Sequence, residues 1–168
     1  NAPLTASGQY TVIVTSVAGC VSTAYATVIV NPTPTAQMVT NSPICVNNIL
    51  NLTATGGVSY LWNGPSGFTS TVQNPSVNAI TTAFSGNYQV TVTDANGCSA
   101  TTNTTAVINP LPVPTITSGP NTGCAPLCVE YTVSSIPTVA SANWSLGDGS
   151  TVNGAINAGA CYHIAGIY

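Results

Sequence analysis

Hydrophobic and polar residues alternate with a period of two along much of the chain. The alternation is clear at residues 10–14 (YTVIV) and 88–92 (YQVTV), and it recurs at residues 48–55 and 58–62. Such alternation places every second side chain on one face, which is typical of a strand with one buried face. No segment combines the 3.6-residue period of a helix with its capping residues. The pattern therefore predicts an all-β protein with no significant helix.

Turn residues separate the predicted strands. Residues 94–97 read D-A-N-G, and Asn-Gly tolerates the positive φ that a tight hairpin turn requires. A partner strand is expected at residues 99–108, so residues 85–108 form a predicted hairpin. The G-P-S-G segment at residues 64–67 supplies another turn. About seven short strands in a unit of this size, with turns at regular intervals, indicate a β-sandwich.

The sequence repeats itself with an offset of 78 residues, so that S-G-Q-Y-T-V-I-V-T at residues 7–15 matches S-G-N-Y-Q-V-T-V-T at residues 85–93. A third copy begins at A-G-I-Y, residues 165–168. One tyrosine marks the equivalent point of each copy: Tyr10, Tyr88 and Tyr168. A regular repeat of this kind indicates an array of similar units. We expect the chain to be a window on a longer array, with one complete unit and two partial ones.

Proline-spaced segments separate the repeated units. They are N-P-T-P at residues 31–34 and N-P-L-P-V-P at residues 109–114, and such segments favour extended, semi-rigid backbone. We therefore expect three parts: the end of one domain at residues 1–32, a complete domain at 33–110, and the beginning of another at 111–168. Small β domains on stiff linkers suit a rod that holds other groups at a distance.

The charge composition excludes several classes of partner. The chain has no Lys or Arg, three acidic residues and one His, for a net charge of −3. Nucleic acid binding requires a basic surface, and so does attraction to an anionic membrane. No nucleic acid partner and no membrane insertion are therefore expected. Salt bridges between basic and acidic side chains cannot form, so stability must come from burial, hydrogen bonds and disulfides.

Six cysteines indicate an oxidising, extracellular environment. Units of about 80 residues have small cores, and secreted domains of this size commonly contain disulfides. Zinc sites require a second close pair of cysteines or histidines. Cys124 and Cys128 are the one close pair, and His163 alone does not complete a site. We expect no metal and no cofactor.

The ionisable side chains offer no catalytic arrangement. Acid–base catalysis by carboxylates needs two of them across a cleft. Asp94 and Asp148 lie in predicted turns of different domains, where aspartate caps the turn backbone. Glu130 lies in a predicted strand and is expected to face solvent, and His163 has no nucleophile or second ligand nearby. We therefore expect no catalytic residue and no enzymatic activity.

Aromatic residues have two interpretations. Trp62, Tyr60 and Phe68 would form a sugar-stacking platform if their rings were exposed. In the interpretation that we favour, Trp62 belongs to the core, as do Tyr88 and Trp144, and Phe68 covers a turn.

Two motifs resemble known β-sandwich families. Residues 81–88 (TTAFSGNY) resemble the approach to strand F of the immunoglobulin fold, with its tyrosine corner, and Trp62 resembles the core tryptophan of strand C. Residues 144–150 (WSLGDGS) are similar to the W-x-F-G-D-G-S motif of PKD domains, with Leu146 in place of the usual phenylalanine. This resemblance implies tandem immunoglobulin-like sandwiches, of which residues 33–110 are Ig-like and residues 111–168 PKD-like.

Longer phrases resemble the repeat arrays of Bacteroidota surface proteins, such as gliding-motility adhesins and other large cargo of the type 9 secretion system. They are TVTDANGC at residues 91–98, LWNGPSGFTS at residues 61–70 and CAPLCV at residues 124–129. The resemblance implies a secreted, cell-surface protein with a structural or adhesive role.

The resemblance to the immunoglobulin sandwich assigns the cysteines to strands. Cys128 opens strand B and Cys161 lies near the end of strand E, which implies a disulfide within the domain. The other four cysteines precede strand B or follow strand F: Cys20, Cys45, Cys98 and Cys124. Two pairings remain open for them. Each cysteine before strand B bonds the cysteine after strand F of the following unit, or Cys45 bonds Cys98 within one domain.

We expect a structural or adhesive segment of a long extracellular stalk, filament or adhesin shaft. Its partners are neighbouring repeats of the same polypeptide, with lateral self-association as a further possibility and an unidentified surface or polysaccharide ligand. The alternative is a spacer or carbohydrate-binding module of a secreted hydrolase.

Overall fold

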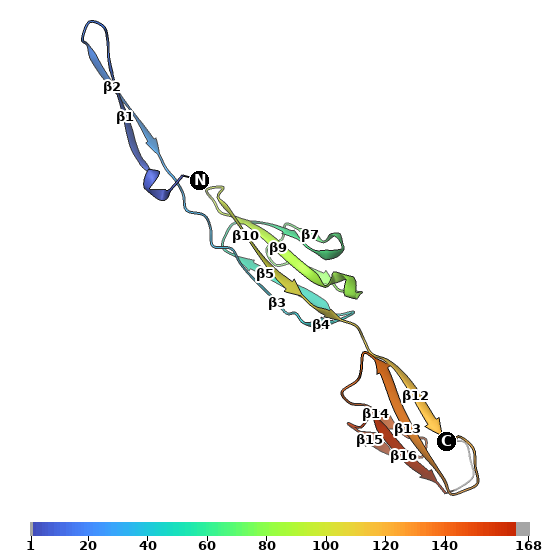
Figure 1. Ribbon diagram of the computed structural model, residues 1–168. Coiled ribbons are helices and arrows are strands. Elements are labelled where there is room, and N and C mark those ends of the chain that lie inside the picture. The colour runs from blue at the N-terminus through green and yellow to red at the C-terminus, as the bar shows by residue number, and fades with distance from the viewer. Residues whose placement is uncertain (1, 164–168) are drawn as a thin grey trace. The chain divides into compact units, whose positions relative to one another are not determined.

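The computed structural model describes residues 2–163. The chain divides into two compact units, Asn1–Asn109 and Pro110–Tyr168. Both units are built from strands, with three single-turn 3₁₀ helices in the first unit (Figure 1), and the predicted all-β class is confirmed. The strands of the first unit are β1 (Gly8–Thr15), β2 (Val21–Val28), β3 (Gln37–Thr40), β4 (Ile44–Cys45), β5 (Ile49–Thr55), β6 (Ser59–Asn63), β7 (Thr69–Ser70), β8 (Ser76–Asn78), β9 (Gly86–Thr93), β10 (Ser99–Ala106) and β11 (Ile108–Asn109). The 3₁₀ helices are η1 (Leu4–Ala6), η2 (Pro65–Gly67) and η3 (Thr82–Phe84).

Two sheets enclose the core of the first unit. One sheet has the order β3-β5-β8 and the other has the order β10-β9-β6-β7, while β4 pairs in parallel with β11. These orders correspond to strands A-B-E and G-F-C-C′ of an immunoglobulin-like sandwich. The alternating pattern of the sequence places the apolar residues of both sheets in a common core. Its fully buried large side chains are Trp62, Tyr88, Leu50, Leu52, Val90 and Val92.

A tyrosine corner joins the two sheets, as the resemblance implied. The Tyr88 hydroxyl donates a hydrogen bond to the Phe84 carbonyl oxygen at 2.9 Å, across the connection from η3 to β9. The Tyr88 ring packs edge-on against Phe68, with 5.7 Å between ring centroids. Burial raises the pKa of the Tyr88 phenol above its ordinary value, because the phenolate would lose its hydration. The corner therefore fixes the start of strand F.

The predicted strand at residues 99–108 is in fact two strands. Strand β10 ends at Ala106. Strand β11 then pairs in parallel with β4, which belongs to neither of the two sheets. The break lies at Val107, whose amide donates to the Ser42 hydroxyl at 2.7 Å, while its carbonyl accepts from the Ile44 amide at 3.1 Å. The chain therefore changes its partner at Val107, which the alternation of the sequence alone does not reveal.

The β1–β2 hairpin repeats the register of the β9–β10 hairpin. Gly8 lies opposite Val28 in the first hairpin, as Gly86 lies opposite Ala106 in the second. Equivalent side chains make equivalent hydrogen bonds. Ser7 Oγ accepts from the Val30 amide at 2.9 Å and Ser85 Oγ accepts from the Ile108 amide at 2.8 Å. The Tyr10 hydroxyl donates to the Ala6 carbonyl at 3.0 Å, as Tyr88 does to Phe84. The sequence repeat is therefore a repeat of structure.

The second unit has the first five strands of the same plan. They are β12 (Val113–Gly119), β13 (Leu127–Ile136), β14 (Asn143–Ser145), β15 (Thr151–Asn153) and β16 (Asn157–Tyr162). The sheet orders β12-β13-β16 and β14-β15 correspond to A-B-E and C-C′. A small core forms around Trp144, Leu146 and Ala158. The third copy of the repeat, with Tyr168, lies outside the described residues.

Candidate functional site

The acidic side chains cap turns. Asp94 Oδ1 accepts hydrogen bonds from the amides of Asn96 and Cys98, both at 2.9 Å. Asp148 Oδ1 accepts from the Ser150 hydroxyl at 2.6 Å and from the Ser150 amide at 2.9 Å. These bonds from Ser150 lower the pKa of the Asp148 carboxyl below its ordinary value, because they stabilise the carboxylate. Both aspartates therefore stabilise the turns in which they lie.

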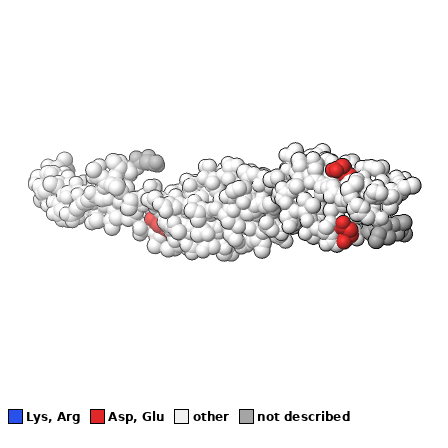
Figure 2. Space-filling view, turned by 90° about the horizontal axis from the view of Figure 1, so that it is seen from below, with Lys and Arg blue, Asp and Glu red and all other residues white. Residues whose placement is uncertain are grey.

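The remaining ionisable residues do not gather with the aspartates. Glu130 on β13 and His163 after β16 are both exposed. Within residues 2–163, no three His, Cys, Asp or Glu side chains lie close enough together to hold a metal ion. Figure 2 shows one face of the molecule, with isolated acidic residues on a surface without Lys or Arg. No helix in the described part of the chain has the length and apolar character needed to cross a membrane.

The aromatic residues that would form a sugar platform instead belong to the core. Trp62 is fully buried, and its indole N–H donates to the Val72 carbonyl at 2.9 Å. Tyr60 is buried with its hydroxyl on the Gly57 carbonyl at 2.8 Å, and Phe68 packs against the Tyr88 ring. The platform interpretation is therefore wrong, because the ring faces are not available to a sugar. Trp144 is also buried, at 9% exposure.

One disulfide closes the second unit. Cys128 on β13 lies directly opposite Cys161 on β16, and their sulfurs are bonded at 2.03 Å. The bond joins neighbouring strands B and E of the same sheet, at the positions that the resemblance assigned to the two cysteines. It therefore ties together strands that are 33 residues apart in sequence.

Cys45 and Cys98 are both free thiols in the structure. Cys45 on β4 lies beside Asn109, at the end of the sandwich where the chain leaves it. Cys98 precedes β10 and lies at the opposite end of that strand. Cys98 and Asn109 are eleven positions apart along β10 and β11, which at about 3.3 Å per residue is on the order of 30 Å. A disulfide requires Cα atoms within about 7 Å, so the alternative pair within one domain does not form.

The four free thiols lie at or near strand ends: Cys20 and Cys98 directly precede β2 and β10, Cys45 ends β4, and Cys124 lies in the loop before β13. Cys20, Cys45 and Cys124 are exposed, and Cys98 is half-buried. The Cys98 sulfur lies 3.9 Å from the Asn31 carbonyl oxygen, in the segment through which the chain enters the sandwich. Cys20 occupies the same turn of the first hairpin, and its amide bonds the Ser16 hydroxyl as the Cys98 amide bonds Asp94.

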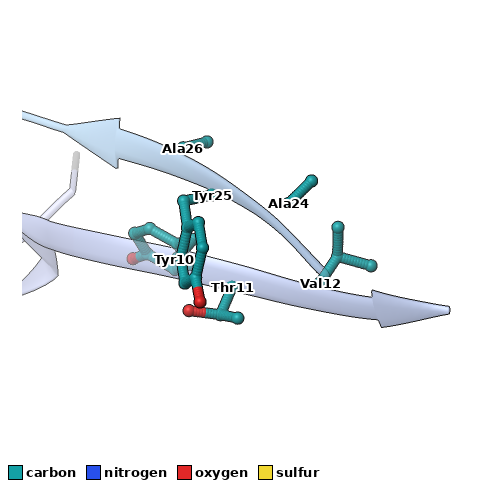
Figure 3. A pocket seen from close by; sticks show the side chains of 6 residues that line it. All are labelled: Tyr10, Thr11, Val12, Ala24, Tyr25 and Ala26. Atoms are coloured by element: carbon teal, nitrogen blue, oxygen red, sulfur yellow. The ribbon is translucent and has the colours of Figure 1, made fainter. Parts of the chain in front are cut away.

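The most prominent surface feature is the apolar face of the β1–β2 hairpin. Tyr10, Val12 and Val14 are 53%, 55% and 57% exposed, whereas their repeat equivalents Tyr88, Val90 and Val92 are 0% exposed. We define the open face as Tyr10, Val12 and Val14 on β1 together with Ala24 and Ala26 on β2. A hollow of about 200 Å³ lies at this hairpin (Figure 3), lined by Tyr10, Thr11, Val12, Ala24, Tyr25 and Ala26.

Sequence reasoning did not identify the open face as a site. The signal was present in the 78-residue offset, since it maps the open face onto core positions of the complete sandwich. Among the described residues, no second sheet covers the open face, which makes it a candidate interaction surface.

Comparison with known proteins adds little to this description. No family model matches the sequence, and no curated protein is significantly similar to it. Among solved structures, the chain is similar to the structure of the amphioxus IgVJ-C2 molecule, with a TM-score of 0.41 and 16% sequence identity. The match covers 64% of this chain and 63% of that chain. The immunoglobulin-like assignment rests on the strand order, the register and the tyrosine corner.

Proposed function

We propose that this chain is a structural segment of a long extracellular protein, which acts as a stalk, filament or adhesin shaft on a bacterial surface of the Bacteroidota type. The observation that carries the proposal is the repeat of the hairpin, which extends from sequence to register and hydrogen bonds. Copying one self-contained β unit lengthens a shaft without a new fold. The disulfide between Cys128 and Cys161 suits an oxidising location.

The ionisable side chains also favour a structural role. Asp94 and Asp148 are engaged in turns, and the aromatic residues that would bind sugar are engaged in cores. The chain is rich in neutral Ser, Thr and Asn side chains and poor in charged ones. Its surface is therefore hydrated through neutral polar groups and has no strong electrostatic potential.

Disulfides between successive units would staple the shaft lengthwise. Each unit has one cysteine before strand B, at the position of Cys45 or Cys124, and one after strand F, at the position of Cys20 or Cys98. In this proposal, the cysteine before strand B of each unit bonds the cysteine after strand F of the following unit. The positions of Cys45 and Cys98 at opposite ends of one sandwich support this arrangement. In a head-to-tail array, those two ends face neighbouring units.

Antibody labelling of intact cells tests the extracellular role. Antibodies raised against the complete sandwich, residues 33–109, should label unpermeabilised cells of the source organism, and permeabilisation should not increase the signal. An antibody against a cytoplasmic protein is the control and should label permeabilised cells alone. Labelling that requires permeabilisation would contradict the proposal.

A further inference from the structure

We propose that the parallel pair of β4 and β11, together with Ser42, is a mechanical clamp that bears tension across the complete sandwich. The chain enters this sandwich beside the start of β10, where the Cys98 sulfur lies 3.9 Å from the Asn31 carbonyl oxygen. It leaves at Asn109, where β11 ends. Tension on the chain therefore pulls the entering and leaving segments apart along β10 and β11. This inference deepens the proposed function and rests on it for the source of the tension.

The clamp joins the entering segment directly to the leaving segment. Strand β3 follows the entering segment and leads into β4, while β10 leads into β11. Strands β4 and β11 run in the same direction, with Ile44 paired with Ile108. Tension pulls β4 back toward its start and β11 onward past its end, so the two strands must slide past each other before the chain between them can extend. While the pair holds, residues 47–106 bear no tension.

The hydrogen bonds of the clamp resist this sliding together. The Ile44 amide donates to the Val107 carbonyl oxygen at 3.1 Å. The Val46 amide donates to the Asn109 carbonyl oxygen at 2.9 Å. The Val107 amide donates to the Ser42 hydroxyl oxygen at 2.7 Å. Because inter-strand hydrogen bonds lie across the strands, a force along the strands loads all of them at once, whereas peeling would load them one after another.

Apolar side chains cover the clamp on the side of the core. Ile108 is 3% exposed, and Ile44 and Val46 pack against the same core while partly buried. A hydrogen bond in such surroundings is electrostatically stronger than one in water. The packing therefore strengthens the bonds that bear the tension.

A serine also anchors β11 to the start of β9. The Ser85 hydroxyl accepts a hydrogen bond from the Ile108 amide at 2.8 Å and donates one to the Ile108 carbonyl oxygen at 3.3 Å. The repeat preserves this anchor, because the Ser7 hydroxyl accepts from the Val30 amide at 2.9 Å. In both copies the anchored residue lies two positions before the first proline of a linker. Each linker therefore begins beside a residue that is tied to its own hairpin, which suits a point where force enters the fold.

Single-molecule force spectroscopy tests the clamp on the chain of residues 1–168, tethered at its two ends and with the four free thiols replaced by serine. Unfolding of the complete sandwich is recognised by a released length of roughly 200 Å, from the residues between β4 and β11. The second unit releases much less, because the Cys128–Cys161 disulfide keeps the residues between these cysteines from extending. Ser42→Ala should make the sandwich unfold about fivefold faster at a given force, since this factor corresponds to about 1 kcal/mol, the usual contribution of one hydrogen bond.

The matched control is Ser76→Ala. The Ser76 hydroxyl donates to the Asn51 side-chain carbonyl oxygen at 2.9 Å, so this substitution also removes one serine hydrogen bond. The lost bond joins β8 to β5, within the part of the chain that the clamp shields from tension. Ser76→Ala should therefore leave the unfolding rate under force unchanged. Equal acceleration by the two substitutions would contradict a special role of the clamp.

A second pulling direction separates a clamp from ordinary stability. In the chain without free thiols, Asn96→Cys provides an attachment point in the exposed turn that precedes β10. Tension between this residue and the N-terminal tether acts at one end of the sandwich, so it does not draw β4 and β11 past each other. The sandwich should then unfold at a clearly lower force, and Ser42→Ala should not change that force. Equal unfolding forces in the two directions would overturn the proposal.

The mechanical inference and the proposed function fail separately. A sandwich that unfolds at equal forces in both directions has no clamp, wherever the protein resides. Labelling that requires permeabilised cells removes the extracellular role, whatever force the sandwich withstands.

Discussion

Replacing Tyr88 with alanine is expected to lower the free energy of unfolding of the complete sandwich by about 3–5 kcal/mol, the usual cost of truncating a large buried aromatic residue. The Tyr88 ring is fully buried and packs against Phe68. Its hydroxyl also closes the tyrosine corner on the Phe84 carbonyl. The substitution therefore removes apolar contacts from both sheets and a hydrogen bond from the start of strand F.

The repeat provides a matched control for this substitution. Tyr10 makes the equivalent hydrogen bond, to Ala6, but its side chain is 53% exposed. Tyr10→Ala should therefore change the stability of the complete sandwich by less than about 0.5 kcal/mol in dilute protein. Urea unfolding measures both variants in a Trp144→Phe background, where the fluorescence of Trp62 reports on the first unit alone. Equal effects of the two substitutions would contradict the assignment of Tyr88 to a complete core and of Tyr10 to an open face.

Removal of the disulfide between Cys128 and Cys161 should destabilise the second unit by about 3–4 kcal/mol. The bond closes a loop with a sequence separation of 33 residues, and the chain-entropy model gives that cost for a loop of this length. A domain of about 60 residues is typically stable by only about 3–9 kcal/mol. The core around Trp144, Leu146 and Ala158 is small. The double replacement Cys128→Ala and Cys161→Ala should therefore leave the second unit largely unfolded or marginal.

Hydrogen exchange distinguishes this effect from a general loss of structure. Amides of β13 and β16 should lose most of their protection in the double variant, while amides of β5 and β9 in the first unit keep theirs. Cys124→Ala is the control, because this thiol is free and exposed and lies four residues from Cys128. A loss below about 1 kcal/mol in the double variant would mean that the strands hold together without the bond.

The local elements of the fold could be read from the sequence for physical reasons. Alternation places Tyr88, Val90 and Val92 on one face, and any sheet that covers this face buries all three. The Asn96-Gly97 dipeptide forms the predicted hairpin turn, with Gly97 at a φ of 81°. Asp94 caps that turn, as its side-chain chemistry implies. These features depend on a few neighbouring residues, so the local sequence determines them.

The features that were not predicted depend on distant parts of the chain. The change of partner at Val107 requires Ser42, which lies 65 residues away. Tyr10 and Val12 are exposed in the described part of the chain, although they alternate with polar residues in the same way as the buried Tyr88 and Val90. A periodic pattern identifies which side chains share a face, but it does not identify what covers that face. The pairing of β4 with β11 is likewise a product of the assembled sandwich.

The structural role proposed here depends most directly on how consecutive repeats are joined. The decisive measurement is a non-reducing peptide map of the protein taken from its source cells after alkylation of free thiols. Pepsin suits this map, because trypsin has no Lys or Arg to cleave and acid suppresses disulfide exchange. We predict cross-linked peptides that join the Cys98 position of one unit to the Cys45 position of the preceding unit, alongside the Cys128–Cys161 bond. Alkylated Cys20, Cys45, Cys98 and Cys124, with no bond between repeats, would contradict a covalently stapled shaft.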